Sequence, residues 1–297
     1  MLPSFAPKKM TFMISEEQFQ AELDRIIHTS LQEDIGEGDH SSLACIPAEA
    51  VGMAKLLVKD EGILAGVDFA KQVFQAVDTD LKMETLLKDG AEVSYGDIAF
   101  YVKGRSRSLL MAERLVLNSM QRMSAVATKT HSYVKLLEGT STKLLDTRKT
   151  TPGIRALEKW AVRIGGGENH RFALYDMIML KDNHIDFAGS ISQAISQTKN
   201  YLEELGKPLK IIVEARNLQE VEEILECGGV YRILLDNFDY PMTREAVKMI
   251  GNQSLTESSG GITKEALRKY ALCGVNYISS GSLTHSVHNL DLSLKAV

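Results

Sequence analysis

The chain of 297 residues is long enough for one large domain or two modest ones, and 44% hydrophobic and 25% charged residues are typical of a soluble globular enzyme. A net charge of −5 gives no general attraction to nucleic acid or to an anionic membrane, and no apolar run is long enough to span a membrane. The three separated cysteines (Cys45, Cys227 and Cys273) exclude a disulfide framework and favour the reducing cytoplasm. Residues 1–18 have no continuous apolar stretch behind their charges, so we expect no secretory signal.

The first half of the chain predicts a mixed α+β domain. A helix is expected over Glu16–Leu31, followed by strands at Ala54–Val58, Gly62–Ala65 and Ile98–Val102 that Gly and Pro residues punctuate. A long helix from Leu109 to about Leu137 is expected to bridge two domains, because apolar residues recur along one stripe. The stripe consists of Leu109, Ala112, Val116, Met120, Met123 and Ala127.

Strand and helix patterns alternate in the second half of the chain. The expected strands are Lys143–Thr147, Asp176–Leu180, Lys210–Ala215, Arg232–Asp236, Ser254–Glu257 and Asn276–Ser279. Helices between strands of one sheet require parallel pairing, so this half predicts a doubly wound sheet or a barrel of the α/β class.

Polar residues follow these strands repeatedly. They are Asp146, Arg148 and Lys149, then Lys181–His184, Glu214, Asp236 and Asn237, Glu257–Gly261, and finally Ser280 and Gly281. In an α/β barrel the carboxyl ends of the strands form one face, and this face carries the active site. The last two strand ends are rich in glycine and favour phosphate binding as a pair, although each taken alone is equally typical of a tight turn.

The segment from Lys143 to His184 holds eight Lys or Arg residues against five acids, in a chain that is acidic overall. Lys159 and Arg163 are expected on the solvated face of a helix. The cations beside Gly, Pro or strand ends are instead candidates for binding a carboxylate or a phosphate. These cations are Arg148, Lys149, Arg171 and Lys181.

Two acidic strand ends favour magnesium over zinc. His170 and His184 form no close zinc-binding pair, and zinc needs three or four protein ligands. Glu214 and Asp236 suit Mg²⁺ around a phosphorylated substrate, and they are equally suited as ion-pair partners of the basic cluster.

Several motifs resemble those of the quinolinate phosphoribosyltransferases, also called carboxylating nicotinate-nucleotide pyrophosphorylases. The matching segments are Glu33–Ser42, Glu113–Asn118, Leu144–Arg155, Gly165–Arg171, Met179–His184, Leu234–Asn237, Ser259–Ile262 and Ser280–Ser286. They follow the order of the family along nearly the whole chain. Two departures are visible: Ser41-Ser42 stands where the family usually has Thr-Thr, and Ile212 stands where it has a glutamate.

The resemblance implies an N-terminal α/β sandwich at residues 1–128, to which the tail 286–297 can be added, and an incomplete, seven-stranded α/β barrel at 129–285. It also implies a homodimer with shared active sites. The quinolinate-binding residues would be Arg148, His170, Arg171 and Lys181, with Arg114 supplied by the partner subunit. The residues implied for 5-phosphoribosyl-1-diphosphate are Lys149, Glu214, Asp236, Ser259, Gly260, Gly261, Ser280 and Gly281, with Glu214 and Asp236 acting through Mg²⁺.

The implied reaction transfers a phosphoribosyl group to quinolinate with loss of CO₂, giving nicotinate mononucleotide for NAD synthesis. The residues agree with it, since two adjacent carboxylates require several cations at close quarters. Three alternatives stay open: a related transferase for another pyridine carboxylate, a barrel lyase with Lys181 as a Schiff-base nucleophile, and a catalytically silent phosphate-binding module.

Overall fold

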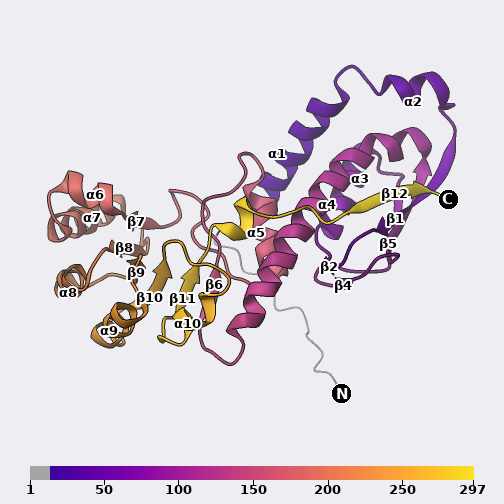
Figure 1. Ribbon diagram of the computed structural model, residues 1–297. Helices are drawn as coiled ribbons and strands as arrows, with labels where there is room; N and C mark the ends of the chain where they lie inside the picture. Colours follow the sequence, from indigo (N-terminus) through magenta and orange to yellow (C-terminus); the bar gives the residue numbers. More distant parts are fainter. Residues whose placement is uncertain (1–13) are drawn as a thin grey trace. The chain divides into compact units, whose positions relative to one another are not determined.

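The computed structural model describes residues 14–297, which divide by packing into two units (Figure 1). The first unit holds residues 14–131, 149–166 and 282–297, and the second holds residues 132–148 and 167–281. The expectation of no secretory signal falls mainly on residues 1–13, which lie outside the described residues. The domain boundary at residues 128 and 129 stays a prediction, because units that pack together need not coincide with family domains. No described helix is long and apolar enough to cross a membrane.

An antiparallel sheet in the order β12-β1-β5-β3 forms the centre of the first unit. Its strands are β1 (Val51–Val58), β3 (Lys82–Thr85), β5 (Ile98–Arg105) and β12 (Leu292–Ala296), and β2 (Gly62–Ile63) pairs separately with β4 (Glu92–Val93). Along β1, Ala54, Leu56 and Val58 are buried while the residues between them are more exposed, so one face of the strand packs on the core. The last strand of the chain thus belongs to the first unit.

Helices cover this core. They are α1 (Glu16–Ile35), α2 (His40–Cys45), α3 (Val67–Val77), α5 (Arg155–Ile164) and α11 (Ser282–His285). Helix α1 begins at a capping box, in which Ser15 and Gln18 satisfy each other's backbone N–H groups. It packs on α3 and α5, and Phe19 meets Trp160 edge to face at 5.6 Å between ring centroids. The expectation of a solvated Lys159 is wrong: seven of the ten residues of α5 are buried, and Lys159 is 1% exposed.

The long helix predicted from the apolar stripe is present as α4 (Ser106–Val134), followed by the short helix η1 (Lys135–Leu137). All six residues of the stripe are buried. The period of the hydrophobic residues therefore predicted both the helix and its buried face.

A parallel sheet of six strands, in the order β6-β11-β10-β9-β8-β7, forms the second unit. The strands are β6 (Lys143–Leu145), β7 (Ile178–Leu180), β8 (Ile211–Ala215), β9 (Arg232–Asp236), β10 (Leu255–Ser259) and β11 (Tyr277–Ser279). All six predicted strands are present within two residues at each end. A parallel bridge from Leu145 to Glu168 adds to the sheet beside β6, so the described residues show six strands and one isolated bridge where the resemblance implies seven strands.

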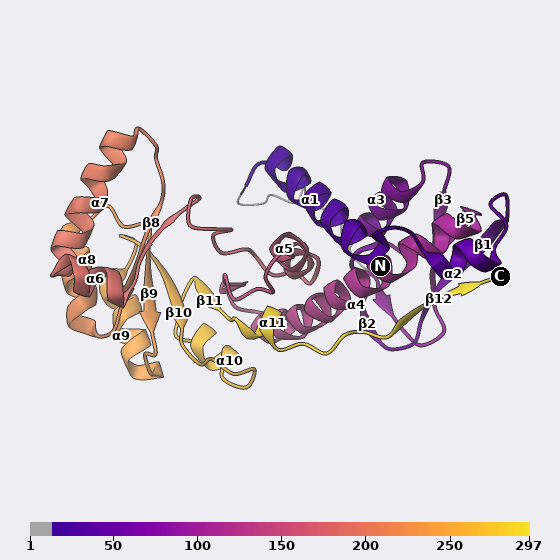
Figure 2. The same cartoon turned by 90° about the horizontal axis from the view of Figure 1, so that it is seen from above.

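The helices of the second unit are α6 (Asp182–Ala188), α7 (Ile191–Leu205), α8 (Leu218–Cys227), α9 (Tyr240–Ile250) and α10 (Leu267–Ala271). Figures 1 and 2 show α7, α8 and α9 side by side on one face of the sheet. Residues that alternate along β8 and β9 are buried on both faces, as parallel strands usually are. The predicted α/β class is confirmed.

Asp78, which follows α3, forms hydrogen bonds with residues at the end of β5 and at the start of α4. Its carboxylate accepts hydrogen bonds from Arg105 Nε at 2.8 Å and from Ser108 Oγ at 2.7 Å, and these bonds hold the pKa of Asp78 well below 3.8. The side chain is 3% exposed, whereas Asp80, also near Arg105, is 84% exposed.

We predict that Asp78→Asn lowers the free energy of unfolding by about 1–3 kcal/mol, because a buried charged hydrogen-bond acceptor is lost. Since folding lowers the pKa of Asp78, its ionised form stabilises the native state above the ordinary value of 3.8, and this stability is lost as pH falls through the folded pKa. Urea unfolding at several pH values should therefore show a weaker loss of stability in acid for the variant. Asp80→Asn is the matched control, expected within about 0.5 kcal/mol of wild type; equal effects of the two substitutions would contradict this assignment.

Candidate active site

The register of the parallel strands brings the acidic strand ends together. Glu214 on β8 and Glu257 on β10 are both register partners of Leu234 on β9, so the two carboxylates flank Leu234 on one face of the sheet. Asp236 and its partner Ser259 lie two residues further along, on the same face and closer to the carboxyl edge. The strand ends thus form two successive rows of polar side chains.

Lys181 and Glu214 form an ion pair at this edge. Lys181 Nζ lies 3.2 Å from Glu214 Oε2; the lysine side chain is 48% exposed and the glutamate 7%. Burial raises the pKa of Glu214, while Lys181 lowers it and Asp236 raises it again. A carboxylate in these surroundings gains from any further cation, such as a metal ion carried in by a phosphorylated substrate.

Arg148 and Arg171 place two positive charges near each other. Burial lowers the pKa of Arg171, and the charge of Arg148 lowers it further. Arg171 Nη1 donates a hydrogen bond to Met177 O at 3.1 Å, which fixes the direction of its guanidinium. Arginine stays protonated in proteins, and the negative charge of Asp176 offsets part of this repulsion, so a bound anion would relieve the remainder.

The segment before Arg171 is clamped by Asp146, the residue that follows β6. Its carboxylate accepts hydrogen bonds from Asn169 Nδ2 at 2.6 Å and from the backbone N–H of His170 at 2.8 Å. Asp146 and His170 are both buried. The carboxylate of Asp146 thus fixes the backbone at Asn169 and His170, directly before Arg171.

Glu257, which the sequence places only among the polar strand ends, forms a buried pair with Arg232 that was not predicted. Arg232 Nη1 donates to Glu257 Oε2 at 2.6 Å, and the arginine stacks over the ring of Tyr277 at 4.2 Å. Burial alone would raise the pKa of Glu257, but His170, Arg232 and Ser279 lower it to about 2. The available signal was a charged residue at the start of an apolar strand, Arg232 in β9, because such a residue needs a partner once it is buried.

The glycine-rich end of β10 has a conformation that needs glycine. Gly260 has a φ of 95°, and a Cβ atom there would lie 2.2 Å from Asn237 Oδ1. Asn237, with a φ of 56°, donates its backbone N–H to Ser259 O and its side-chain amide to Asp236 Oδ2. The loop is therefore held against the end of β9.

Ser280 and Gly281 follow β11 in the second unit, with the backbone N–H of Ser280 bonded to Leu145 O. Two predicted residues lie in the first unit instead. Arg114 is exposed on α4, and Lys149 is exposed with its carbonyl accepting a 2.7 Å hydrogen bond from Thr284. The second unit thus collects all the other predicted residues, but not these two.

The two departures from the family pattern have different surroundings. Ile212 is fully buried and packs with Met177 and Leu234, so an apolar residue suits its position below Glu214. Ser42, in α2, donates its backbone N–H to Asp39 and so completes the cap of that helix.

The described residues contain no group of three or more His, Cys, Asp or Glu side chains that would hold a metal ion alone. Magnesium does not need such a group, since it typically binds through one or two carboxylates together with substrate phosphates. Glu214 and Asp236 fit this mode.

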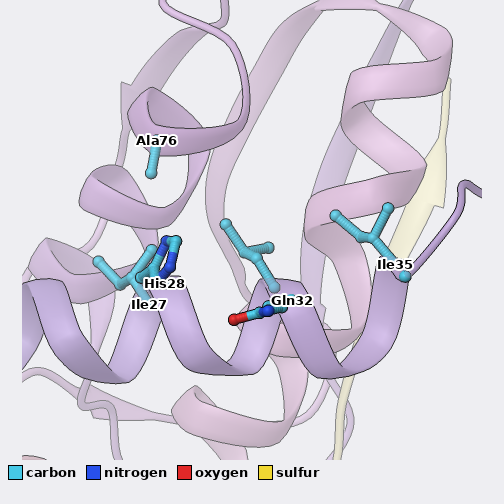
Figure 3. Close-up of a pocket in the computed structure, with 7 residues that line it drawn as sticks. Ile27, His28, Gln32, Ile35 and Ala76 are labelled. Atoms are coloured by element: carbon cyan, nitrogen blue, oxygen red, sulfur yellow. The ribbon is translucent and has the colours of Figure 1, made fainter.

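A pocket of about 350 Å³ lies between α1 and α3 of the first unit (Figure 3). It is lined by Ile27, His28, Leu31, Gln32, Ile35, Gly36 and Ala76, and Figure 3 shows the His28 ring on α1 pointing toward the helix that carries Ala76. The pocket contains no residue of the predicted site and one titratable side chain, so its chemistry does not match a substrate with several negative charges.

The geometry defines an α/β enzyme of the anion-binding class, with cations, carboxylates and a glycine-rich loop at the carboxyl edge of a parallel sheet. Two family descriptions match the chain: the N-terminal domain of quinolinate phosphoribosyl transferase at residues 39–124 and its C-terminal domain at 126–295. The chain belongs to the quinolinate phosphoribosyltransferase family.

Relatives from distant organisms match the chain over most of its length. Quinolinate phosphoribosyltransferase [decarboxylating] 1b of Nicotiana tabacum is 43% identical over 92% of this chain and 82% of its own. The probable nicotinate-nucleotide pyrophosphorylase [carboxylating] of Bacillus subtilis is 41% identical over 92% of this chain and 93% of its own. The crystal structure of NadC from Streptococcus pyogenes is 36% identical with a TM-score of 0.86, over 97% of this chain and all of that one. The resemblance seen in the motifs is confirmed.

We predict that Gly260→Ala destabilises the protein more than Gly261→Ala. Both residues have positive φ, which costs an L-residue about 1–2 kcal/mol, but only at position 260 would the new methyl group also collide with Asn237. Urea unfolding should give a loss of at least about 3 kcal/mol for Gly260→Ala and about 1–2 kcal/mol for the control. The reverse order would show that the loop has another conformation.

Proposed function

We propose that the paired cations of the second unit bind quinolinate for phosphoribosyl transfer and decarboxylation. The activity itself, quinolinate phosphoribosyltransferase in NAD biosynthesis, is that of the family to which the chain belongs. The observation that supports our assignment is the repulsion between Arg148 and the buried Arg171, which a dicarboxylate between them would relieve. Lys181, half exposed after β7, the next strand along the chain, would supply a third positive charge.

The chemistry needs alignment more than a reactive side chain. The pyridine nitrogen attacks C1 of the ribose as diphosphate leaves, and the resulting positive ring nitrogen accepts the electron pair released when the 2-carboxylate departs as CO₂. Fixed cations orient the substrate and offset its charge without reorganising during the reaction. A Schiff-base mechanism is less well supported, because Lys181 pairs with Glu214 whereas such lysines are typically desolvated or beside another cation.

Phosphoribosyl diphosphate would bind along the second row of polar residues and the glycine-rich loops. Ser259, Gly260 and Gly261 after β10 and Ser280 and Gly281 after β11 are the candidates for its 5′-phosphate. Lys149 would meet the diphosphate. Glu214 and Asp236 would hold Mg²⁺, which when bound neutralises charge on the diphosphate.

We assign Arg114 to the site of a second copy of the chain, as the family resemblance implies. Arg114 lies on α4 of the first unit, whereas Arg148, Arg171 and Lys181 lie in the second. A two-fold homodimer can supply a residue of one protomer to the site of its partner. We accordingly propose a dimer with shared sites, in the cytoplasm, where the three free cysteines would stay reduced.

The proposed function is tested by incubating the protein with quinolinate, phosphoribosyl diphosphate and Mg²⁺ and measuring nicotinate mononucleotide and CO₂. Both products should appear in equal amounts, and chelation of Mg²⁺ should stop turnover. Arg171→Ala should lower kcat/KM, and the fall should correspond to a loss of about 2–5 kcal/mol in transition-state stabilisation, because a charged partner of the substrate is removed. The exposed Lys207→Ala, also in the second unit, should stay within about twofold of wild type. Product formation without quinolinate loss, or an unaffected Arg171→Ala enzyme, would refute the assignment.

Mixing two inactive variants tests the shared site. When Arg114→Ala and Lys181→Ala proteins exchange subunits at random, half of the dimers are mixed, and each mixed dimer has one site with both residues intact. Activity should then recover to about a quarter of wild type. If Arg114 served its own subunit, every site would carry one lesion and no activity would return, even with subunit exchange confirmed by mass spectrometry of differently labelled chains.

A further inference from the structure

The loop between β6 and α5 carries Arg148 and Lys149, and the residues that follow them, 151–153, are exposed. Exposed loops are usually more mobile than the elements they connect. This loop is instead tied to Glu158 of α5, whose side chain is 0% exposed. The backbone N–H of Thr151 donates to Glu158 Oε2 at 3.0 Å, and Thr151 Oγ1 donates to Glu158 Oε1 at 2.8 Å. One buried carboxylate therefore holds both the main chain and the side chain of Thr151.

Arg122 of α4 fixes this carboxylate from the other side. Its Nε and Nη2 atoms donate to Glu158 Oε1 at 2.9 Å and 2.7 Å. A buried carboxylate is costly unless it is paired, and hydrogen bonds to a charged arginine are among the stronger ones in proteins. Because Arg122 and Glu158 both lie within helices, the acceptor that Thr151 meets cannot follow the movements of an exposed loop.

Arg122 also connects the loop to α11. Its Nη2 atom donates to the backbone oxygen of Thr284, and Thr284 Oγ1 donates to the backbone oxygen of Lys149 at 2.7 Å. All of these residues belong to the first unit. Glu158 and Arg122 thus join two segments of the first unit, the loop after Lys149 and the helix α11.

Both segments begin where the chain leaves the second unit. These two places are between Arg148 and Lys149 and between Gly281 and Ser282. The residues proposed above for phosphoribosyl diphosphate include Lys149 and Gly281, which stand directly at them. The network of Glu158 and Arg122 therefore fixes the main chain immediately after residues proposed for one and the same substrate.

We propose that Glu158 is a positioning residue for phosphoribosyl diphosphate, which fixes the loop after Lys149 directly and the segment after Gly281 through Arg122. This inference rests on the proposed function for the roles of Lys149 and Gly281, and it adds two residues that lie outside the motifs of the family. Cations proposed for quinolinate have other supports: Arg171 bonds to Met177 O and Lys181 pairs with Glu214. Loss of the network should therefore affect phosphoribosyl diphosphate more than quinolinate.

Glu158→Gln tests the proposal with almost no change of shape. When the glutamine oxygen faces Arg122, its NH₂ group faces the backbone N–H of Thr151, so two donors oppose each other and the loop loses its anchor. We expect a KM for phosphoribosyl diphosphate that is about 10- to 100-fold higher and a KM for quinolinate within about threefold of wild type. An equal rise in both KM values, or no rise in either, would overturn the proposal.

Asp78→Asn is the matched control. Asp78 is also a buried, charged hydrogen-bond acceptor of the first unit, but its partners are Arg105 and Ser108 rather than either of the two segments. Folded Asp78→Asn protein should keep both KM values within about twofold of wild type. If it raises the KM for phosphoribosyl diphosphate as much as Glu158→Gln does, lost stability explains both effects and the proposal is wrong.

The anchor can be measured without substrate, even if Glu158→Gln does not fold. Amide hydrogen exchange of the wild-type protein, followed by NMR, should show the N–H of exposed Thr151 exchanging at least about 100-fold more slowly than in an unstructured chain. Exchange of this N–H at the unstructured rate would overturn the proposal. Failure of the proposed function is distinct, because wild-type protein would then form no nicotinate mononucleotide, however slowly the Thr151 amide exchanges.

Discussion

The parallel register of the second-unit sheet is the constraint on which the site depends. Because each strand runs in the same direction, every chain segment that leaves a strand does so at the same edge. Lys181, Glu214, Asp236 and Ser259 are far apart in sequence, yet each stands at the end of a strand or directly after it.

Concentrating charge at one edge has an energetic consequence. Arg171 is buried near another arginine, and Glu214 is buried near two other acids, so neither group is in its most favourable environment. Native proteins retain such arrangements mainly where a ligand compensates them. A dicarboxylate and a phosphorylated sugar with Mg²⁺ have the charges that each group lacks, so binding energy would be available for orientation of the two substrates.

Buried residues behind the carboxyl edge of the sheet hold the site residues in place. Asp146 binds the backbone of His170, Glu257 binds Arg232, and Asn237 closes over the turn at Gly260. Buried charges of this kind are costly unless they are paired, so they are expected where a fixed geometry is needed. In this protein they support Arg171 and the glycine-rich loop, the two elements that would contact opposite ends of the combined substrates.

The sequence by itself determined the order of strands and helices, the buried stripe of α4 and the chemical character of the strand ends. These features depend on local periodicity and on residues close in sequence, which a linear reading captures. It also led to the correct family, because the motifs around Arg148, Arg171 and Lys181 are contiguous. Only the tertiary structure decided that Lys159 is buried, that Arg232 and Glu257 form a pair, and that Asp146 binds the backbone of His170. Such pairings join residues whose separation in sequence carries no signal, since they depend on the register between strands and on which face each side chain occupies.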